Sequence, residues 1–114
     1  MKLIDKSNKI SRKELRMMAE AGFGDLVKAV VDVAEKVMVV DAEMHADQEQ
    51  FLLEKGYKQE NIWGINLYPD VESEEWIEFD SMINLRPSRG NRSRGVDNAE
   101  VREKIINIVD ELVD

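Results

Sequence analysis

Apolar residues recur at helical spacing near both ends of the chain. Towards the C-terminus they fall at offsets 0, 4, 7, 8 and 11, namely Val101, Ile105, Ile108, Val109 and Leu112. This spacing is typical of a helix that lies on a core, and Asp97 with Glu100 is expected to cap its start. Near the N-terminus, Ser11 and Glu14 form a capping box that predicts a second helix, ending at Gly22 or Gly24. The first ten residues have no such pattern and are expected to form an extended arm.

The segment from Leu26 to Met44 fits either a helix or a β-hairpin. Valine occupies six of the fourteen positions from 26 to 39, and β-branched residues favour strands. A hairpin that turns at Glu35-Lys36 pairs Lys28 with Glu43 on one face. Its other face is apolar and carries Val27, Ala29, Val31, Val33, Met38, Val40, Ala42 and Met44. Because one register explains both faces, we predict the hairpin.

Residues 62–85 predict a second hairpin. Ile62–Tyr68 and Trp76–Leu85 have the composition of strands, and the acidic loop between them begins at Pro69. Pairing Tyr68 with Trp76 places the apolar residues of both strands on one face. In this register Gly64 lies opposite Asp80 and leaves room above the backbone.

These elements predict an α+β fold. A short helix, capped by Asp47 and ended by Gly56, lies between the hairpins. We expect an antiparallel sheet of about four strands, in two hairpins, packed on one face against the N-terminal and C-terminal amphipathic helices. The 114 residues are enough for one domain, 1–114, in which residues 1–10 are the arm.

The sequence also favours a cytoplasmic protein without a membrane partner. The longest aliphatic run, residues 37–40, is far shorter than the roughly 20 residues that span a bilayer. The first ten residues include charges and no apolar stretch, so no signal peptide is expected. The chain has no cysteine, which excludes disulfides and thiolate chemistry.

Charge is distributed unevenly along the chain. The net charge of −8 argues against nucleic acid as a partner, because the mean field repels phosphates. Residues 70–85 contain six carboxylates and no base, whereas residues 86–95 contain four arginines and no acid. A cationic segment in an anionic protein is the most unusual feature of the sequence.

Four phrases of the sequence together resemble a known family. They are EMHADQE (43–49), LLEKG (52–56), QENIWGINLYP (59–69) and SMINLRPSRGNRS (81–93). The likeness covers roughly residues 25–112 and is to an uncharacterised family of small prokaryotic proteins, a domain of unknown function. This resemblance implies a free-standing prokaryotic domain, but no activity, cofactor or site residue.

The arginine-rich segment Arg86–Gly95 is the first candidate site. Guanidinium groups match phosphate and carboxylate geometry, and the start of the C-terminal helix offers free N–H groups nearby. The candidate anion-binding residues are Arg86, Arg89, Asn91, Arg92, Ser93 and Arg94. Alternatively, the arginines pair with carboxylates such as Glu78 and Asp80, in the same chain or in a second copy.

A row of acidic residues around the only histidine is the second candidate. If the first hairpin continues to Asp47, Asp41, Glu43 and His45 share a face. With Glu78 and Asp80 these residues are candidate ligands for magnesium or manganese. Alternating acids are also typical of a solvated sheet face, and we favour that interpretation.

The aromatic residues form a third candidate. Trp63 alternates with Ile65 and Leu67 and is expected in the core. Trp76 falls on the polar face of the second hairpin, where an indole stacks a ligand or packs under the acidic loop. We favour packing.

Three functions remain open. The first is a binding module whose arginine-rich loop holds a phosphorylated small molecule. The second is an interaction protein that forms a homodimer through its acidic strand face and arginine loop. The third is a metal-assisted hydrolase. The sequence identifies no cofactor and does not decide whether the protein is an enzyme.

Overall fold

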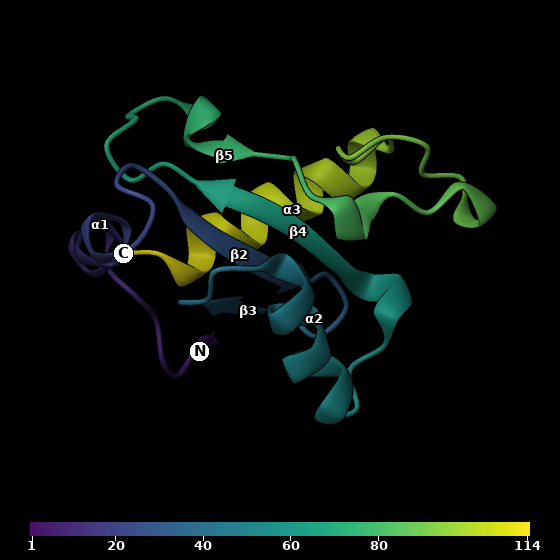
Figure 1. Ribbon diagram of the computed structural model, residues 1–114, viewed down its shortest axis with the longest axis horizontal. Helices are drawn as coiled ribbons and strands as arrows, with labels where there is room; N and C mark the ends of the chain where they lie inside the picture. Colours follow the sequence, from purple (N-terminus) through teal and green to yellow (C-terminus); the bar gives the residue numbers. More distant parts are fainter.

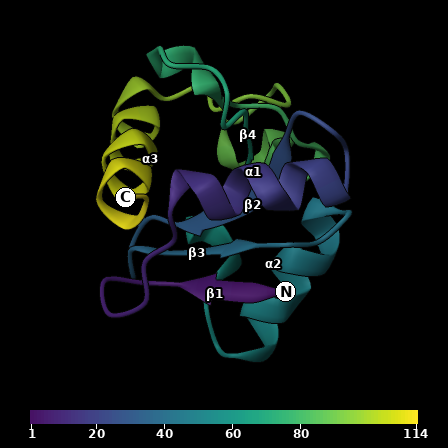
Figure 2. The ribbon, with the colours of Figure 1, turned by 90° about the vertical axis from the view of Figure 1, so that its left-hand side faces the viewer.

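The protein is built on one five-stranded antiparallel sheet with the strand order β1-β3-β2-β4-β5 (Figure 1 and Figure 2). The computed structural model describes all residues, 1–114. Its strands and α-helices, in chain order, are β1 (Lys2–Ile4), α1 (Arg12–Ala21), β2 (Val27–Asp32), β3 (Val37–Val40), α2 (His45–Glu54), β4 (Ile62–Leu67), β5 (Ile77–Glu78) and α3 (Ala99–Leu112). Four 3-10 helices complete the chain: η1 (Gln59–Asn61), η2 (Glu74–Trp76), η3 (Met82–Asn84) and η4 (Pro87–Arg89). The predicted α+β class is confirmed, with five strands instead of four.

Helices cover both faces of the sheet. Figure 2 shows α3 and α2 on opposite sides of the strands. The larger core contains 18 buried residues, among them Leu15 of α1 and Ile105 of α3, and lies on the α1 and α3 side. A smaller core of five residues lies under α2 and comprises Val30, Val37, Val39, Leu52 and Ile62. The expectation that helices cover only one face is therefore wrong, because Leu52 brings α2 onto the other face.

The first ten residues are extended, but they are part of the sheet. Lys2–Ile4 pair with Met38–Val40 as an edge strand. Ile4 and Ile10 are fully buried, so these two side chains anchor the segment that was predicted to be an extended arm. The Asp114 N–H donates to the Ile10 carbonyl at 2.8 Å, which ties the two ends of the chain together.

The β2–β3 hairpin confirms the predicted faces but not the predicted turn. Val31 pairs with Met38, a register two residues away from the expected one. Each side chain still lies on the predicted face, because side chains alternate with a period of two and the shift is two residues. The loop is longer because Asp32 accepts hydrogen bonds from the N–H groups of Ala34 and Glu35, and Lys36 adopts φ +58°. The predicted Lys28–Glu43 strand pair is wrong, since β3 ends at Val40.

The β4–β5 register is the predicted one. Leu67 pairs with Ile77, and the Tyr68 N–H donates to the Trp76 carbonyl at 2.8 Å. However, β5 ends at Glu78, and the expected strand up to Leu85 is wrong. Ser81 accepts a hydrogen bond from the Ile83 N–H and so begins η3 instead.

Two helix starts also differ from expectation. The helix α2 follows Met44, which has no side chain that can cap, so Asp47 lies inside the first turn and is not the cap. The cap of α3 is Asn98, whose side chain accepts from the N–H groups of Glu100 and Val101, and not Asp97. Ser11 caps α1 as predicted. No helix of the protein is long and apolar enough to cross a membrane.

The packing of α2 leads to a first prediction. Replacing the fully buried Leu52 by alanine is expected to lower the free energy of unfolding by roughly 2–5 kcal/mol, because it empties the smaller core. Urea denaturation measures the change. The exposed Met17 of α1 provides the control, since Met17→Ala is expected to stay within about 0.5 kcal/mol of the wild type. Equal effects of the two substitutions would contradict the placement of α2.

Candidate functional site

Two buried asparagines organise the irregular segment between β5 and α3. Asn84 joins this segment to β4, because it accepts from the Gly64 N–H at 2.8 Å and donates to the carbonyls of Gly64 and Arg94. Asn91 donates to the carbonyls of Asn84, Ser93 and Gly95. Because buried backbone groups need hydrogen-bond partners, these side-chain amides provide the bonds that a neighbouring strand would otherwise supply.

Gly64 lets this segment lie directly on β4. A methyl group at Gly64 would come within 2.6 Å of Ser81 Cβ and Oγ and 3.2 Å of His45 Cγ. The absence of a side chain therefore allows Ser81 and His45 to meet above the same point of the strand. The room expected over Gly64 exists, and Ser81 fills it.

His45 is held in one tautomer at the start of α2. Its Nε2 lies 2.7 Å from the Ile65 carbonyl oxygen, which only accepts, so Nε2 is the protonated nitrogen. Burial lowers the pKa of His45 below its usual value of 6.5, and the charges of Lys28 and Arg94 act in the same direction against the opposing effects of the Ile65 hydrogen bond and Asp80. The side chain is neutral at pH 7, and Nδ1 is left as an acceptor.

These residues form the wall of a pocket that we call the α2 N-terminal pocket. It has a volume of about 210 Å³. Its lining comes from β2, β4, the start of α2, the η3 region and the arginine-rich loop: Lys28, Glu43, Met44, His45, Ala46, Asn66, Asp80, Ser81, Met82, Ile83 and Arg94. The pocket therefore brings together Glu43, His45, Asp80 and Arg94, four residues that the sequence placed in two separate candidate sites.

The pocket contains several groups that can bind an anion. The N–H groups at the start of α2 face no capping side chain, since Met44 occupies the cap position, and a helix start carries a partial positive charge. Lys28 of β2 also lines the pocket, and its Nζ lies 5.3 Å from the centre of the Phe23 ring. Arg94 contributes a guanidinium group, whose Nε lies 2.8 Å from Asp80 Oδ1.

Acceptors line the inner side of the same pocket. Asn66 is 5% exposed, and its amide nitrogen donates to Glu78 Oε1 at 2.8 Å and to the Asp80 carbonyl at 3.3 Å. Its Oδ1 has no partner. A buried acceptor without a donor is costly, so a bound group that donates a hydrogen bond would stabilise this side of the pocket.

Most of the predicted anion-binding residues have other roles. Arg86 donates to the carbonyls of Ile62 and Ile83, and its Nη2 lies 3.9 Å from Glu49 Oε2. Arg89 pairs with Glu60 at 3.3 Å on the surface.

The remaining members of the predicted set stabilise the loop or face solvent. Asn91 and Ser93 hold it together, since Ser93 Oγ donates to Asp97 Oδ1 at 2.5 Å, while the side chain of Arg92 is exposed. The hydrogen bonds from Ser93 and the Arg92 N–H lower the pKa of Asp97. Of the six predicted residues, only Arg94 lies in the pocket.

Three of the predicted metal ligands, Glu43, His45 and Asp80, line one pocket, but the predicted ligands do not come close enough together to form a metal site. Asp41 lies beyond the end of β3 with φ +66°, and Glu78 is bound by Asn66 and by the Tyr68 hydroxyl. No group of three or more His, Asp or Glu side chains is close enough to hold a metal ion. The row predicted around His45 is wrong because the strand stops at Val40 and α2 begins at His45.

An arginine side chain lies over the ring of each of the two tryptophans. Arg86 lies 4.7 Å from the Trp63 ring, which packs against the core. Arg12 lies 3.8 Å from the Trp76 ring and donates to the Pro69 and Val71 carbonyls, which holds the acidic loop. Trp76 is buried and not on the polar face. The favoured interpretation, packing under the acidic loop, is confirmed.

Sequence reasoning missed the three other polar residues of the pocket, Lys28, Asn66 and Ser81. The signal available was the predicted register, which already placed Asn66 beside Glu78 and Gly64 beside Asp80. The predicted register did not indicate where α2 lies, and α2 closes the pocket above these residues.

The close approach at Gly64 gives a second prediction. Gly64→Ala is expected to cost roughly 1–3 kcal/mol of stability, because the new methyl group overlaps Ser81. In a Ser81→Gly background the same substitution is expected to cost less, and urea denaturation of the four proteins measures the difference. An equal cost in both backgrounds would show that Ser81 does not occupy this space.

The buried neutral histidine gives a third prediction. Because the pKa of His45 is lowered in the folded state, the unfolded chain takes up the proton first as the pH falls below 6.5, and folding is disfavoured. The stability advantage of the wild type over His45→Gln is expected to be largest above pH 7 and to shrink as the pH falls below 6.5. Urea denaturation across this range tests it, and a difference independent of pH would contradict it.

The comparisons with known proteins identify a family but no activity. No curated protein and no solved structure matches the chain significantly. A family model described as a protein of unknown function, DUF5674, matches residues 2–112. Because this match spans nearly the whole chain, the protein belongs to the DUF5674 family.

Proposed function

We propose that the protein is a binding module that holds a small anionic molecule in the α2 N-terminal pocket. The observation that carries this proposal is that α2 begins without a capping side chain at the wall of a cavity that also contains Lys28 and Arg94. Helix N–H groups and guanidinium groups are the usual donors to phosphate and carboxylate oxygens. Arg94 is thus the contribution of the arginine-rich loop to anion binding.

The acceptors of the pocket restrict the rest of the ligand. Asn66 Oδ1 has no donor, and His45 Nδ1 is an acceptor because Nε2 is protonated. Asp80 and Glu43 also accept hydrogen bonds. A molecule that carries hydroxyl groups besides its anionic group satisfies both sets, as a phosphorylated polyol does.

The size of the pocket favours a small ligand. Its volume of about 210 Å³ is below the roughly 300–1,000 Å³ of sites for drug-sized molecules. Nucleic acid is not the proposed partner, since the net charge is −8 and such binding relies on many cationic contacts. We also propose a cytoplasmic location in a prokaryote, in keeping with a small domain that lacks cysteine.

Acid–base catalysis on the bound molecule is a second candidate function. It is favoured by the neutral His45 imidazole, whose Nδ1 is available to accept a proton inside the pocket. The homodimer is less favoured, because Arg86 and Arg89 already lie near carboxylates of the same chain. A metal-assisted hydrolase is less favoured, since the acids do not cluster.

The binding proposal predicts a selective effect of Arg94. Titration of the isotope-labelled protein with glycerol 1-phosphate, followed by NMR, is expected to shift the amide signals of His45 and Ala46 to saturation. Arg94→Gln is expected to weaken binding about tenfold or more, the value of one lost charge-assisted hydrogen bond. Arg89→Gln is the matched control, because this arginine also pairs with a surface acid but lies outside the pocket.

Inorganic phosphate serves as the second probe in the same experiment. Weaker binding of phosphate than of glycerol 1-phosphate would support the role of the hydroxyl acceptors. The absence of saturable shifts at His45 and Ala46 with both probes, or equal losses in the two variants, would overturn the proposal. Turnover of the probe that disappears in His45→Gln would favour the catalytic function.

A further inference from the structure

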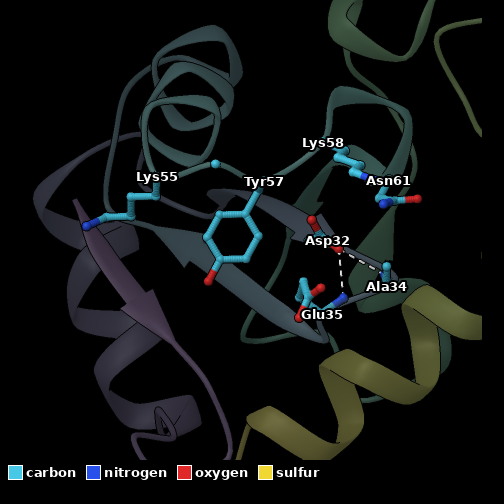
Figure 3. A pocket seen from close by; sticks show the side chains of 8 residues that line it. Asp32, Ala34, Glu35, Lys55, Tyr57, Lys58 and Asn61 are labelled. Atoms are coloured by element: carbon cyan, nitrogen blue, oxygen red, sulfur yellow. Dashed lines mark hydrogen bonds between the residues drawn. The ribbon is translucent and has the colours of Figure 1, made fainter.

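A second cavity lies at the opposite end of α2. It has a volume of about 660 Å³ and is formed by the β2–β3 turn and the segment that joins α2 to η1. Its polar lining consists of Asp32, Glu35, Lys55, Tyr57, Lys58 and Asn61 (Figure 3). None of these residues belongs to the α2 N-terminal pocket, so the two cavities are separate.

The floor of this cavity is a buried carboxylate with an unused oxygen. Asp32 is 0% exposed, and its Oδ1 accepts from the N–H groups of Ala34 and Glu35 at 2.9 and 2.8 Å. These two bonds stabilise the turn. Its Oδ2 is buried and has no partner, and Figure 3 shows it pointing away from the turn, towards the space between Tyr57 and Lys58. Leaving a buried anionic oxygen unpaired is costly, so the position requires a hydrogen-bond donor.

The surroundings of Asp32 favour a donor that is also a cation. Glu35 places a second carboxylate on the same side of the cavity, and the ring of Tyr57 stands beside them (Figure 3). Aromatic faces attract cations. The C-terminal end of α2 also lies here, at Lys55, and a helix end carries a partial negative charge.

The two lysines of the cavity leave this position open. The Lys55 ammonium group lies 4.8 Å from the Phe51 ring and points away from Asp32 in Figure 3. Neither Lys55 nor Lys58 forms an ion pair with Asp32, whose Oδ2 is without a partner. They stand at the rim, where they suit an anionic or polar remainder of the ligand.

We propose that this cavity binds an organic cation, a primary ammonium or guanidinium group that donates to Asp32 Oδ2 and faces Glu35 and Tyr57. A free amine and a lysine or arginine side chain of a partner protein offer the same group. This site is independent of the proposed anion pocket.

Three probes test the cation site in the full-length protein. The labelled chain is titrated at constant ionic strength with 1,4-diaminobutane, with L-arginine and with an acetylated, amidated lysine peptide, and sodium chloride is the blank. Saturable shifts are expected at the amides of Ala34, Glu35 and Tyr57. Tighter binding of the amine or arginine identifies a small molecule as the source, and tighter binding of the peptide identifies a protein.

Asp32→Asn is the diagnostic variant. The asparagine oxygen can keep both turn hydrogen bonds while an amide nitrogen replaces the free acceptor, so the variant is expected to fold and to bind the probe at least tenfold more weakly. Asp41→Asn is the matched control, because it removes the same charge at an exposed position with φ +66° that asparagine tolerates. Glu35→Gln, at an exposed position, is expected to weaken binding severalfold without affecting folding.

Several outcomes would overturn the proposal. They are the absence of saturable shifts with all three probes, equal shifts with sodium chloride, or unchanged affinity in both Asp32→Asn and Glu35→Gln. Shifts of His45 and Ala46 by glycerol 1-phosphate are expected to persist in Asp32→Asn, which separates failure at this cavity from failure at the anion pocket.

Discussion

The hydrogen bonds of two buried asparagine side chains are the constraint on which the candidate site depends. The segment from the end of β5 to the start of α3 has no strand partner, yet it must pack against β4. Asn84 supplies donor and acceptor to Gly64 and a donor to Arg94, and Asn91 binds three further carbonyls. Gly64 makes the contact possible because any larger residue would displace Ser81. Without these contacts, Asp80, Ser81 and Arg94 would have no fixed position opposite His45.

One helix relates the two cavities to each other. The start of α2 lines the pocket that contains Lys28 and Arg94, and its end lines the cavity that contains Asp32. Its middle is fixed by Leu52 in the smaller core and by Gln48, which donates to the Lys28 carbonyl at 2.8 Å. The peptide dipoles of α2 therefore favour opposite charges at its two ends. In a protein with a net charge of −8, the proposed anion site therefore lies at the end of α2 that carries the partial positive charge.

Sequence patterns predicted the fold better than the site. The β4–β5 register followed from matching apolar residues on both strands, and the β2–β3 faces held because a slip of two residues changes no face. The start of α2 was missed because Met44 gives no capping signal. The role of Arg86 was missed for another reason. Its partners are the backbone carbonyls of Ile62 and Ile83, and a sequence does not show where backbone carbonyls point. Asp32 appeared only as a strand residue, since its turn bonds and its free oxygen depend on tertiary structure.

The central strands of the sheet are longer than its edge strands. The central strands β2 and β4 have six residues each, whereas the edge strands β1 and β5 have three and two. Exposed strand edges are the places where separate molecules join into fibrils, and short or charged edges discourage such joining. Lys2 lies on one border, and η2 and η3 flank the other. The tapering outline therefore gives the protein a built-in resistance to amyloid-like self-assembly.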